Sequence, residues 1–433
     1  MVRSDAKYEK SVLSDGLRVV TEEIPHVRSV SVGVWIDNGS RDETDHLNGI
    51  SHFIEHMVFK GTRHRSVREI AESIESVGGY LNAFTGKEHT CYYARVLDEH
   101  LVLAMDVLAD LVLNPTFPTR ELEKERGVII EELKQTEDDP DDVIHDYFER
   151  DLFGGHSLGF PVIGTEENLR RLTRKDLTTF RESRYSPERM VVAAAGNVKH
   201  HAVVKLSERL FRAGNLRTDT HGGGRTMAPA TIGNTRKVYD RPIQQAHVCL
   251  GTVGYSVLSD RRFPLMVLNT LLGDGMSSRL FQNIREKYGF AYSVYSFANM
   301  ISDTGTVGAY VGTDAAHVER CIDLIWRELD RLAQRPVGRQ ELERTKEQLK
   351  GNMMLSLENI PNRMMRLGSS ELYFGELMSL DVILSKIEAV TEQDILDVSR
   401  ALFRPDRFCT VIFQPNGEAP SIGPTDRPSR SKK

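Results

Sequence analysis

His52-Phe53-Ile54-Glu55-His56 is the most informative stretch of this 433-residue chain. On a helix, positions i, i+3 and i+4 lie on one face, so both imidazoles and the carboxylate would point the same way. Two neutral imidazoles four residues apart can bind one Zn²⁺, and the glutamate beside them can then transfer protons. A five-residue pattern also arises by chance among 14 histidines, so the interpretation needs a third ligand.

Residues 121–136, ELEKERGVIIEELKQT, supply candidates for that ligand. Their mixture of charged and apolar residues at near-helical spacing predicts a helix. Glu125 and Glu132 are two turns apart and share a face, whereas Glu131 lies about 100° around the helix from Glu132 and competes with it for the ligand role. These acids would also be ordinary on an exposed, solvated helix face.

An H-x-x-E-H pattern followed by E-x6-E resembles the pitrilysin/insulinase family of zinc peptidases, in its short branch similar to mitochondrial processing peptidases. The resemblance implies one Zn²⁺ per chain, with His52, His56 and Glu132 as ligands. It implies Glu55 as the general base and Glu125 as an acid that supports the metal site. The implied catalytic group is completed by two residues of the second half of the chain, Arg285 and Tyr292.

Further motifs carry the same resemblance along residues 8–415. They are FKGT at 59–62, GGYLNAFT at 78–85, EHTCYY at 88–93, SSRLF at 277–281 and REKYGFAY at 285–292. In the family, the aromatic residue corresponding to Phe59 lines the pocket for the residue after the scissile bond. The resemblance also implies an edge strand through Asn82, Ala83 and Phe84, along which an extended peptide substrate binds.

An acidic run, EDDPDD, occupies residues 137–142 and has two interpretations. The first is a helix start, with Asp139 as N-cap, Pro140 in the first helical position and acids favoured by the helix dipole. The second follows from the resemblance, because Asp142 and Asp146 correspond to acids that bind a distal arginine of the substrate in processing peptidases. Both interpretations stay open.

The chain is duplicated. A strand expected at residues 29–38 recurs at 245–253, and the segment SPERM with the strand after it recurs as RPDRF with its own strand. Strands at both ends with helices between them predict an α+β fold of two homologous domains, each a mostly antiparallel sheet with helices packed on one face. The expected divisions are a first domain at 1–212, a linker at 213–234, a second domain at 235–415 and a disordered tail at 416–433.

Only the first copy carries metal-binding residues, because the segment that corresponds to His52–His56 lies near residues 268–272 and is apolar. In the family, the pair corresponding to Arg285 and Tyr292 grips the substrate backbone and faces the zinc when two halves close like a clamshell. Full-length relatives carry four such domains in one chain. Two domains therefore imply a homodimer, with a heterodimer with a related chain as the alternative.

Composition excludes several classes of function. A net charge of −6 argues against a nucleic-acid partner, since no basic surplus is present to neutralise phosphates. No run of 18 apolar residues is present, so we expect no membrane span. The four scattered cysteines favour free thiols in a reducing compartment, and the N-terminal residues lack the pattern of a signal or transit peptide. We therefore expect a cytoplasmic protein.

The leading interpretation is a zinc-dependent metalloendopeptidase that hydrolyses extended peptides or unfolded segments, with a preference for basic, arginine-containing sequences. The alternatives are a non-catalytic structural or regulatory subunit, since the family includes such members, and an active subunit that needs a different partner chain. The retention of both histidines, Glu55 and Glu132 favours the enzyme.

Overall fold

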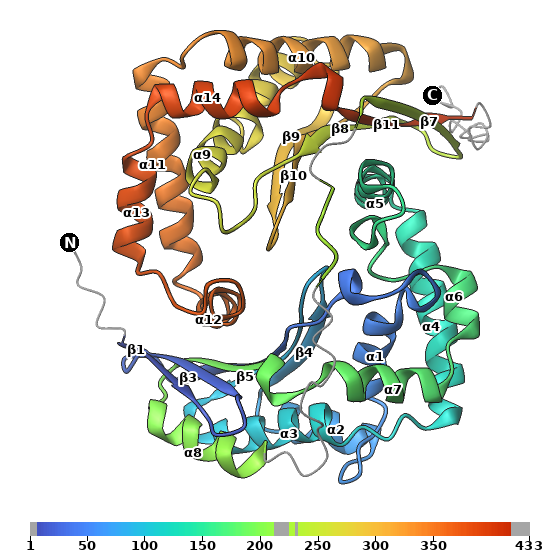
Figure 1. Ribbon diagram of the computed structural model, residues 1–433, viewed down its shortest axis with the longest axis vertical. Helices are drawn as coiled ribbons and strands as arrows, with labels where there is room; N and C mark the ends of the chain where they lie inside the picture. The colour runs from blue at the N-terminus through green and yellow to red at the C-terminus, as the bar shows by residue number, and fades with distance from the viewer. Residues whose placement is uncertain (1–6, 212–224, 230–232, 417–433) are drawn as a thin grey trace, which may run out of the picture.

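The computed structural model describes residues 7–211, 225–229 and 233–416, which form two α+β halves stacked one above the other (Figure 1). Each half is built on a single sheet. In the six-stranded first sheet every neighbouring pair is antiparallel except β2 and β6. Its order is β1 (Lys7–Val12), β2 (Arg18–Glu23), β6 (Met190–Gly196), β3 (Ser29–Ile36), β5 (Thr90–Leu97) and β4 (Tyr80–Thr85).

The five-stranded second sheet repeats this topology. Its order is β7 (Thr235–Arg241), β11 (Cys409–Pro415), β8 (Ala246–Val253), β10 (Gly305–Thr313) and β9 (Ala291–Met300). Its one parallel pair, β7 with β11, corresponds to β2 with β6, and β9 is an edge strand as β4 is. The duplication predicted from the sequence is therefore confirmed, and β1 is an addition that the described part of the second half does not repeat.

Helices fill the chain between the strands. In the first half they are α1 (Ile50–Val58), α2 (Val67–Glu75), α3 (Leu101–Leu113), α4 (Thr119–Glu137), α5 (Pro140–Phe153), α6 (Glu166–Arg171), α7 (Arg174–Arg184) and α8 (His200–Leu210). In the second half they are α9 (Arg262–Gly273), α10 (Val318–Gln334), α11 (Arg339–Ser356), α12 (Ile360–Phe374), α13 (Leu380–Glu388) and α14 (Glu392–Leu402). The helix predicted at 121–136 is confirmed as α4.

The two halves exchange one helix each. α12 packs on β2, β3 and β6 of the first sheet, whereas α5 packs on β8 and β11 of the second (Figure 1). Each exchanged helix buries apolar side chains on the sheet face that the other helices of that half leave uncovered. The two-domain α+β fold is confirmed, but the prediction of helices on only one face of each sheet is wrong, because the exchanged helix covers the opposite face.

A buried ionic cluster also ties the halves together. Arg41 donates to both carboxylate oxygens of Asp303 at 2.6 Å and to Glu88 at 2.7 Å. Glu88 in turn accepts a hydrogen bond from the backbone N–H of Ser302 at 2.9 Å. Asp303 and Ser302 lie in the turn between β9 and β10. The ion pair between Arg41 and Asp303 therefore joins the first half to the second, and a buried ion pair is costly to break.

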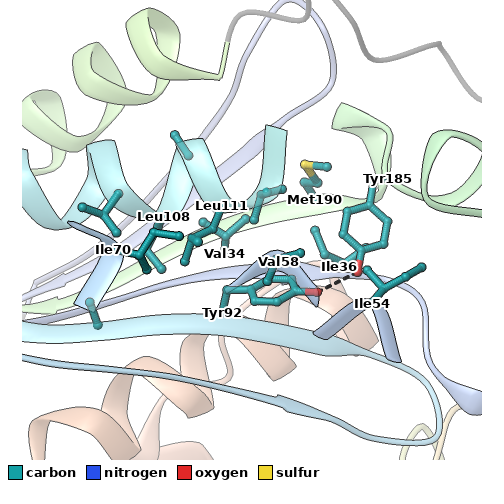
Figure 2. Close-up of a cluster of buried hydrophobic side chains, with 14 of the residues drawn as sticks. Val34, Ile36, Ile54, Val58, Ile70, Tyr92, Leu108, Leu111, Tyr185 and Met190 are labelled. Carbon is teal, nitrogen blue, oxygen red and sulfur yellow. Dashed lines mark hydrogen bonds between the residues drawn. The ribbon is translucent and has the colours of Figure 1, made fainter. Parts of the chain in front are cut away.

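The core of the first half anchors α1. Ile54 and Val58 of this helix pack among side chains of β3, β5 and α3, and the hydroxyl groups of Tyr92 and Tyr185 form a 2.8 Å hydrogen bond within the cluster (Figure 2). Burying one such aliphatic side chain is worth about 1.5–3 kcal/mol. The apolar face of α1 is thereby fixed against the sheet.

Most of the predicted linker, together with residues 417–433 of the predicted tail, lies outside the described residues. All four cysteines are buried and unpaired, as expected for free thiols. No helix in the described ranges is long and apolar enough to cross a lipid bilayer.

Candidate active site

The two faces of α1 separate packing from chemistry. Its buried residues follow the helical repeat and comprise Ile50, Phe53, Ile54, Met57 and Val58, together with Ser51. His52, Glu55 and His56 lie on the other face and are only partly buried. The periodicity that anchors the helix therefore directs both imidazoles and the carboxylate away from the core.

α4 packs against α1 and brings Glu132 to the two histidines. Glu132 Oε2 lies 3.4 Å from His56 Nε2, and Glu132 Oε1 lies 3.8 Å from His52 Nε2. These three residues form the one His, Cys, Asp or Glu cluster in the described ranges whose donor atoms could hold a metal ion, with all three atoms within 4.8 Å of one another. The competing Glu131 is exposed and pairs with Lys134 at 2.7 Å.

The geometry of this cluster fits zinc. Two imidazole nitrogens and one carboxylate oxygen are a common ligand set for catalytic zinc, which leaves a fourth position for water. Bonds of about 2.0–2.1 Å in a tetrahedron place donor atoms roughly 3.3–3.5 Å apart, close to the separations found here. The three donors, which lie within 4.8 Å of one another, would draw closer together to bind one ion.

The charge states suit a cation as well. Burial, and then the neighbouring His56, lower the pKa of His52 to about 4, so that this imidazole is neutral near pH 7. The hydrogen bond from His56 lowers the pKa of Glu132, which is therefore ionised. Burial opposes protonation of His56, but hydrogen bonds to Glu132 and Glu125 outweigh burial and raise its pKa. Metal binding at His56 Nε2 would therefore compete with a proton there.

Glu125 contacts the ring of His56 on the side that faces away from Glu132. Its buried carboxylate lies 3.3 Å from His56 Nδ1, on the side of the ring opposite Glu132. The second oxygen of Glu125 pairs with Lys60 Nζ at 2.7 Å. A carboxylate on the outer nitrogen of a metal-binding histidine fixes the tautomer that leaves Nε2 free for the metal. Lys60 lies in the FKGT motif, but the sequence alone gave no reason to connect it with Glu125.

Glu55 faces a cavity of about 300 Å³ beside the metal ligands. Its Oε2 accepts a 2.5 Å hydrogen bond from the hydroxyl of Thr85, the last residue of β4. Burial raises the pKa of Glu55, and the Thr85 hydrogen bond opposes this rise. The residues around the cavity come from α1, β4, α4, α5 and the segment before α6: His52, Glu55, Ala83, Phe84, Thr85, Glu132, Thr136, Asp146, Val162 and Ile163.

The N-terminus of α1 is fixed by a second buried carboxylate. Glu43 accepts hydrogen bonds from the backbone N–H groups of Gly49 and Ser51, both at 2.8 Å. Gly49 has a φ of 96°, and a Cβ there would lie 2.8 Å from the carbonyl oxygen of Ile163, so glycine is required on both counts. These contacts set where the helix begins relative to the cavity wall.

The two acids proposed for substrate arginine are placed differently. Asp139 caps α5 and Pro140 opens it, as the first interpretation of the acidic run predicted. Asp146, one turn beyond Asp142, lines the cavity with His52 and Glu55, whereas Asp142 is exposed. Burial raises the pKa of Asp146 to about 6, and no hydrogen bond or ion pair engages its carboxylate within the described residues.

The predicted substrate strand is an edge strand, β4. Ala83 and Phe84 line the cavity, whereas Asn82 is exposed and its amide donates to the hydroxyl of Tyr80 at 2.6 Å. Phe59 caps the C-terminus of α1 and packs partly against the core, and it is not among the residues that line this cavity.

Arg285 and Tyr292 lie together but away from the metal ligands. The guanidinium carbon of Arg285 is 4.9 Å from the centre of the Tyr292 ring, and both residues line a separate cavity of about 530 Å³. This cavity shares no lining residue with the one beside Glu55 in the described chain. Tyr292 is the second residue of β9, and its side chain is 77% exposed.

Comparison with known proteins gives these features a context. Residues 18–166 match the family described as Insulinase (Peptidase family M16), and residues 171–349 match the family described as Peptidase M16 inactive domain. An uncharacterised zinc protease of Bacillus subtilis is 43% identical over 94% of this chain and 98% of its own length. One of Streptomyces coelicolor is 44% identical over 90% of this chain and 86% of its own length.

Solved structures show the same fold. A protease from Helicobacter pylori superposes with a TM-score of 0.90 at 22% identity, over 95% of this chain and all of that one. A Pseudomonas fluorescens structure described as a peptidase M16 inactive domain superposes with a TM-score of 0.88 at 18% identity, over 94% of this chain and 98% of that one. At these identities the likeness concerns the fold alone.

Proposed function

The chain belongs to the insulinase family of peptidases, family M16, and we propose that it is a zinc-dependent metalloendopeptidase with its metal on His52, His56 and Glu132. The observation that carries the proposal is the clustering of these three donors, two of which, His52 and Glu132, line the same cavity as Glu55. A protein of this fold without catalytic activity would have no need for three metal-binding side chains and a general base in one place. Their joint presence beside an edge strand supports a catalytic role over a purely structural one.

The chain's own residues divide the reaction between them. When bound, zinc polarises the scissile carbonyl and lowers the pKa of a water molecule toward about 7. Glu55 accepts the proton of the attacking water and returns it to the amine that leaves. Glu125 holds His56 in the orientation that metal binding requires, and Lys60 holds Glu125.

The substrate would be an extended peptide or an unfolded segment. A strand added to the free edge of β4 gains backbone hydrogen bonds that do not depend on sequence, and it passes Ala83 and Phe84 at the cavity. Asp146 would supply a preference for basic side chains, because its carboxylate lines the cavity and makes no hydrogen bond or close ion pair within the described residues. A bound arginine would form one.

We propose that the working unit is a dimer in which each site is shared. Within one chain, Arg285 and Tyr292 line a cavity that shares no lining residue with the one beside Glu55, which favours their supply by a second chain. A homodimer is the simplest assembly that supplies them. A heterodimer with a related chain meets the same requirement.

The test of the activity is Glu55→Gln. This change preserves the shape of the side chain and leaves every ligand in place, so zinc content should be unchanged. Peptide hydrolysis should fall by about 10²–10⁴-fold, the usual contribution of a general base. Hydrolysis of a fluorogenic peptide and metal analysis are measured together on the same preparation, with Glu131→Gln as the control for loss of an exposed carboxylate. An unchanged turnover number for Glu55→Gln would refute the proposed role.

A further inference from the structure

We infer that Thr85 is a positioning residue for Glu55, a role that rests on the proposed function of Glu55 as general base. The Thr85 hydroxyl donates to Glu55 Oε2 at 2.5 Å, a length typical of a hydrogen bond to an ionised carboxylate. With Oε2 held in this way, the orientation of the whole carboxylate is set. Oε1 is then the oxygen left to face the attacking water.

The position of Thr85 is itself well defined. It is the last residue of β4, and it is paired in register with Thr90 of β5. The Thr90 hydroxyl donates to the carbonyl oxygen of Asn38 at 3.0 Å and lies 3.5 Å from Thr85 Oγ1. A β-branched side chain on a paired strand has few rotamers, so the hydroxyl is held in place before any peptide binds.

This contact joins two parts of the site that the sequence keeps apart. Glu55 lies on α1, whereas Thr85 ends the edge strand along which the peptide would lie. Both side chains line the same cavity. A peptide that pairs with β4 is therefore aligned with the strand that also orients the proton-transferring carboxylate, and a single hydroxyl makes the connection.

Thr85→Val tests the inference, because valine keeps the β-branched shape and the strand preference but lacks the hydroxyl. In the zinc-loaded full chain, kcat for a fluorogenic peptide should fall by about 10–100-fold, the range expected for loss of a hydrogen bond to a charged group. KM should change by no more than about twofold. Thr85→Ser restores the donor and should retain most of the activity. Zinc content and the dissociation constant of the peptide for metal-free protein should match those of wild type.

Thr21→Val is the matched control. Thr21 is also a threonine on a strand, and its hydroxyl forms a 2.9 Å hydrogen bond with the His200 side chain. Its strand, β2, is separated from β4 by three other strands of the sheet. The kcat of Thr21→Val should equal that of wild type. A second comparison adds Thr85→Val to Glu55→Gln protein, where it should cause no further loss if it acts through Glu55.

The possible outcomes distinguish a failure of the proposed function from a failure of the role of Thr85. Absence of hydrolysis by wild-type protein contradicts the proposed function, whereas hydrolysis by wild type with full kcat in Thr85→Val overturns only the role of Thr85. A rise in KM at constant kcat would make Thr85 a peptide contact and would also overturn it. If valine lowers the melting temperature, Thr85→Ala and Thr85→Ser are compared on the same measurements, and equal kcat values for these two variants reject the inference.

Discussion

Gly368 of α12 lies directly against the indole ring of Trp35 on β3, so close that a Cβ on residue 368 would come within 2.1 Å of the ring. In the second sheet the glycine is on the strand and the aromatic ring is on the helix: Gly251 of β8 lies under the ring of Phe148 on α5. Each exchanged helix is thus seated by one glycine facing one aromatic ring. The strand supplies the ring in the first sheet, and the helix supplies it in the second.

Gly368→Ala should destabilise the protein although alanine favours helix. The added methyl group meets a rigid ring that is 2% exposed, and overpacking of this kind costs about 1–3 kcal/mol. Gly351→Ala on α11 is the control, because a Cβ there has nothing within 4 Å, and it should stabilise by about 0.5–1 kcal/mol. Denaturant unfolding of both variants measures the difference. Equal effects at the two positions would contradict the close contact with Trp35.

The assignment of the third metal ligand predicts opposite behaviour of two adjacent acids. Glu132→Gln should weaken zinc binding by about a hundredfold, because it replaces an anionic carboxylate with a neutral amide, whereas Glu131→Gln should change it little. Competition with a chelator of known affinity gives both dissociation constants. The reverse ranking would mean that the face of α4 is assigned one residue out of register.

Asp146 should make peptide binding depend on both charge and pH. Since burial raises its pKa to about 6, the carboxylate is charged above that pH and neutral below it. KM for an arginine-containing peptide should therefore fall as pH rises through about 6. Asp146→Asn should remove this dependence and raise KM roughly tenfold at pH 7.5, the value of one charged hydrogen bond.

A neutral peptide of the same length is the control and should be insensitive to Asp146→Asn. Asp142→Asn should have a smaller effect on the basic peptide, because Asp142 is exposed and screened by salt over a Debye length of about 8–10 Å. Equal effects on basic and neutral peptides would instead favour a role for Asp142 in the start of α5 alone.

A mixing experiment tests the shared site. Glu55→Gln and Tyr292→Phe chains should each be nearly inactive alone. In a heterodimer, one site combines an intact Glu55 from one chain with an intact Tyr292 from the other. Random pairing makes about half of the dimers mixed, each with one good site of two, so activity should recover to roughly a quarter of wild type. Verified heterodimers without activity would exclude sharing of the site between chains.

The sequence predicted the local features of this molecule well. The helical repeat of α1 and the recurrence of β3 as β8 depend on neighbours along the chain, and the structure has both where they were expected. The choice between Glu131 and Glu132 could not be made from spacing alone. It depends on which face of α4 packs against α1, a contact between segments far apart in sequence.

The exchange of α5 and α12 was not predicted. The uniformly buried strand β6, MVVAAAG, is typical of a strand covered on both faces, but its composition does not identify what covers it. The contact between Thr85 and Glu55 was missed for a similar reason. The two residues belong to elements whose relative placement is decided by the fold of the whole first half.

The exchanged helices also determine how the molecule can move. Swinging the two sheets apart would strip α12 from β3 and α5 from β8, exposing apolar surface at about 25 cal/mol per Å² and breaking the buried contact between Arg41 and Asp303. The described part of one chain is therefore expected to move as one body. In the proposed dimer, a peptide would enter when the two chains move apart. Turnover on long substrates would therefore be limited by the distance and frequency of that motion between chains.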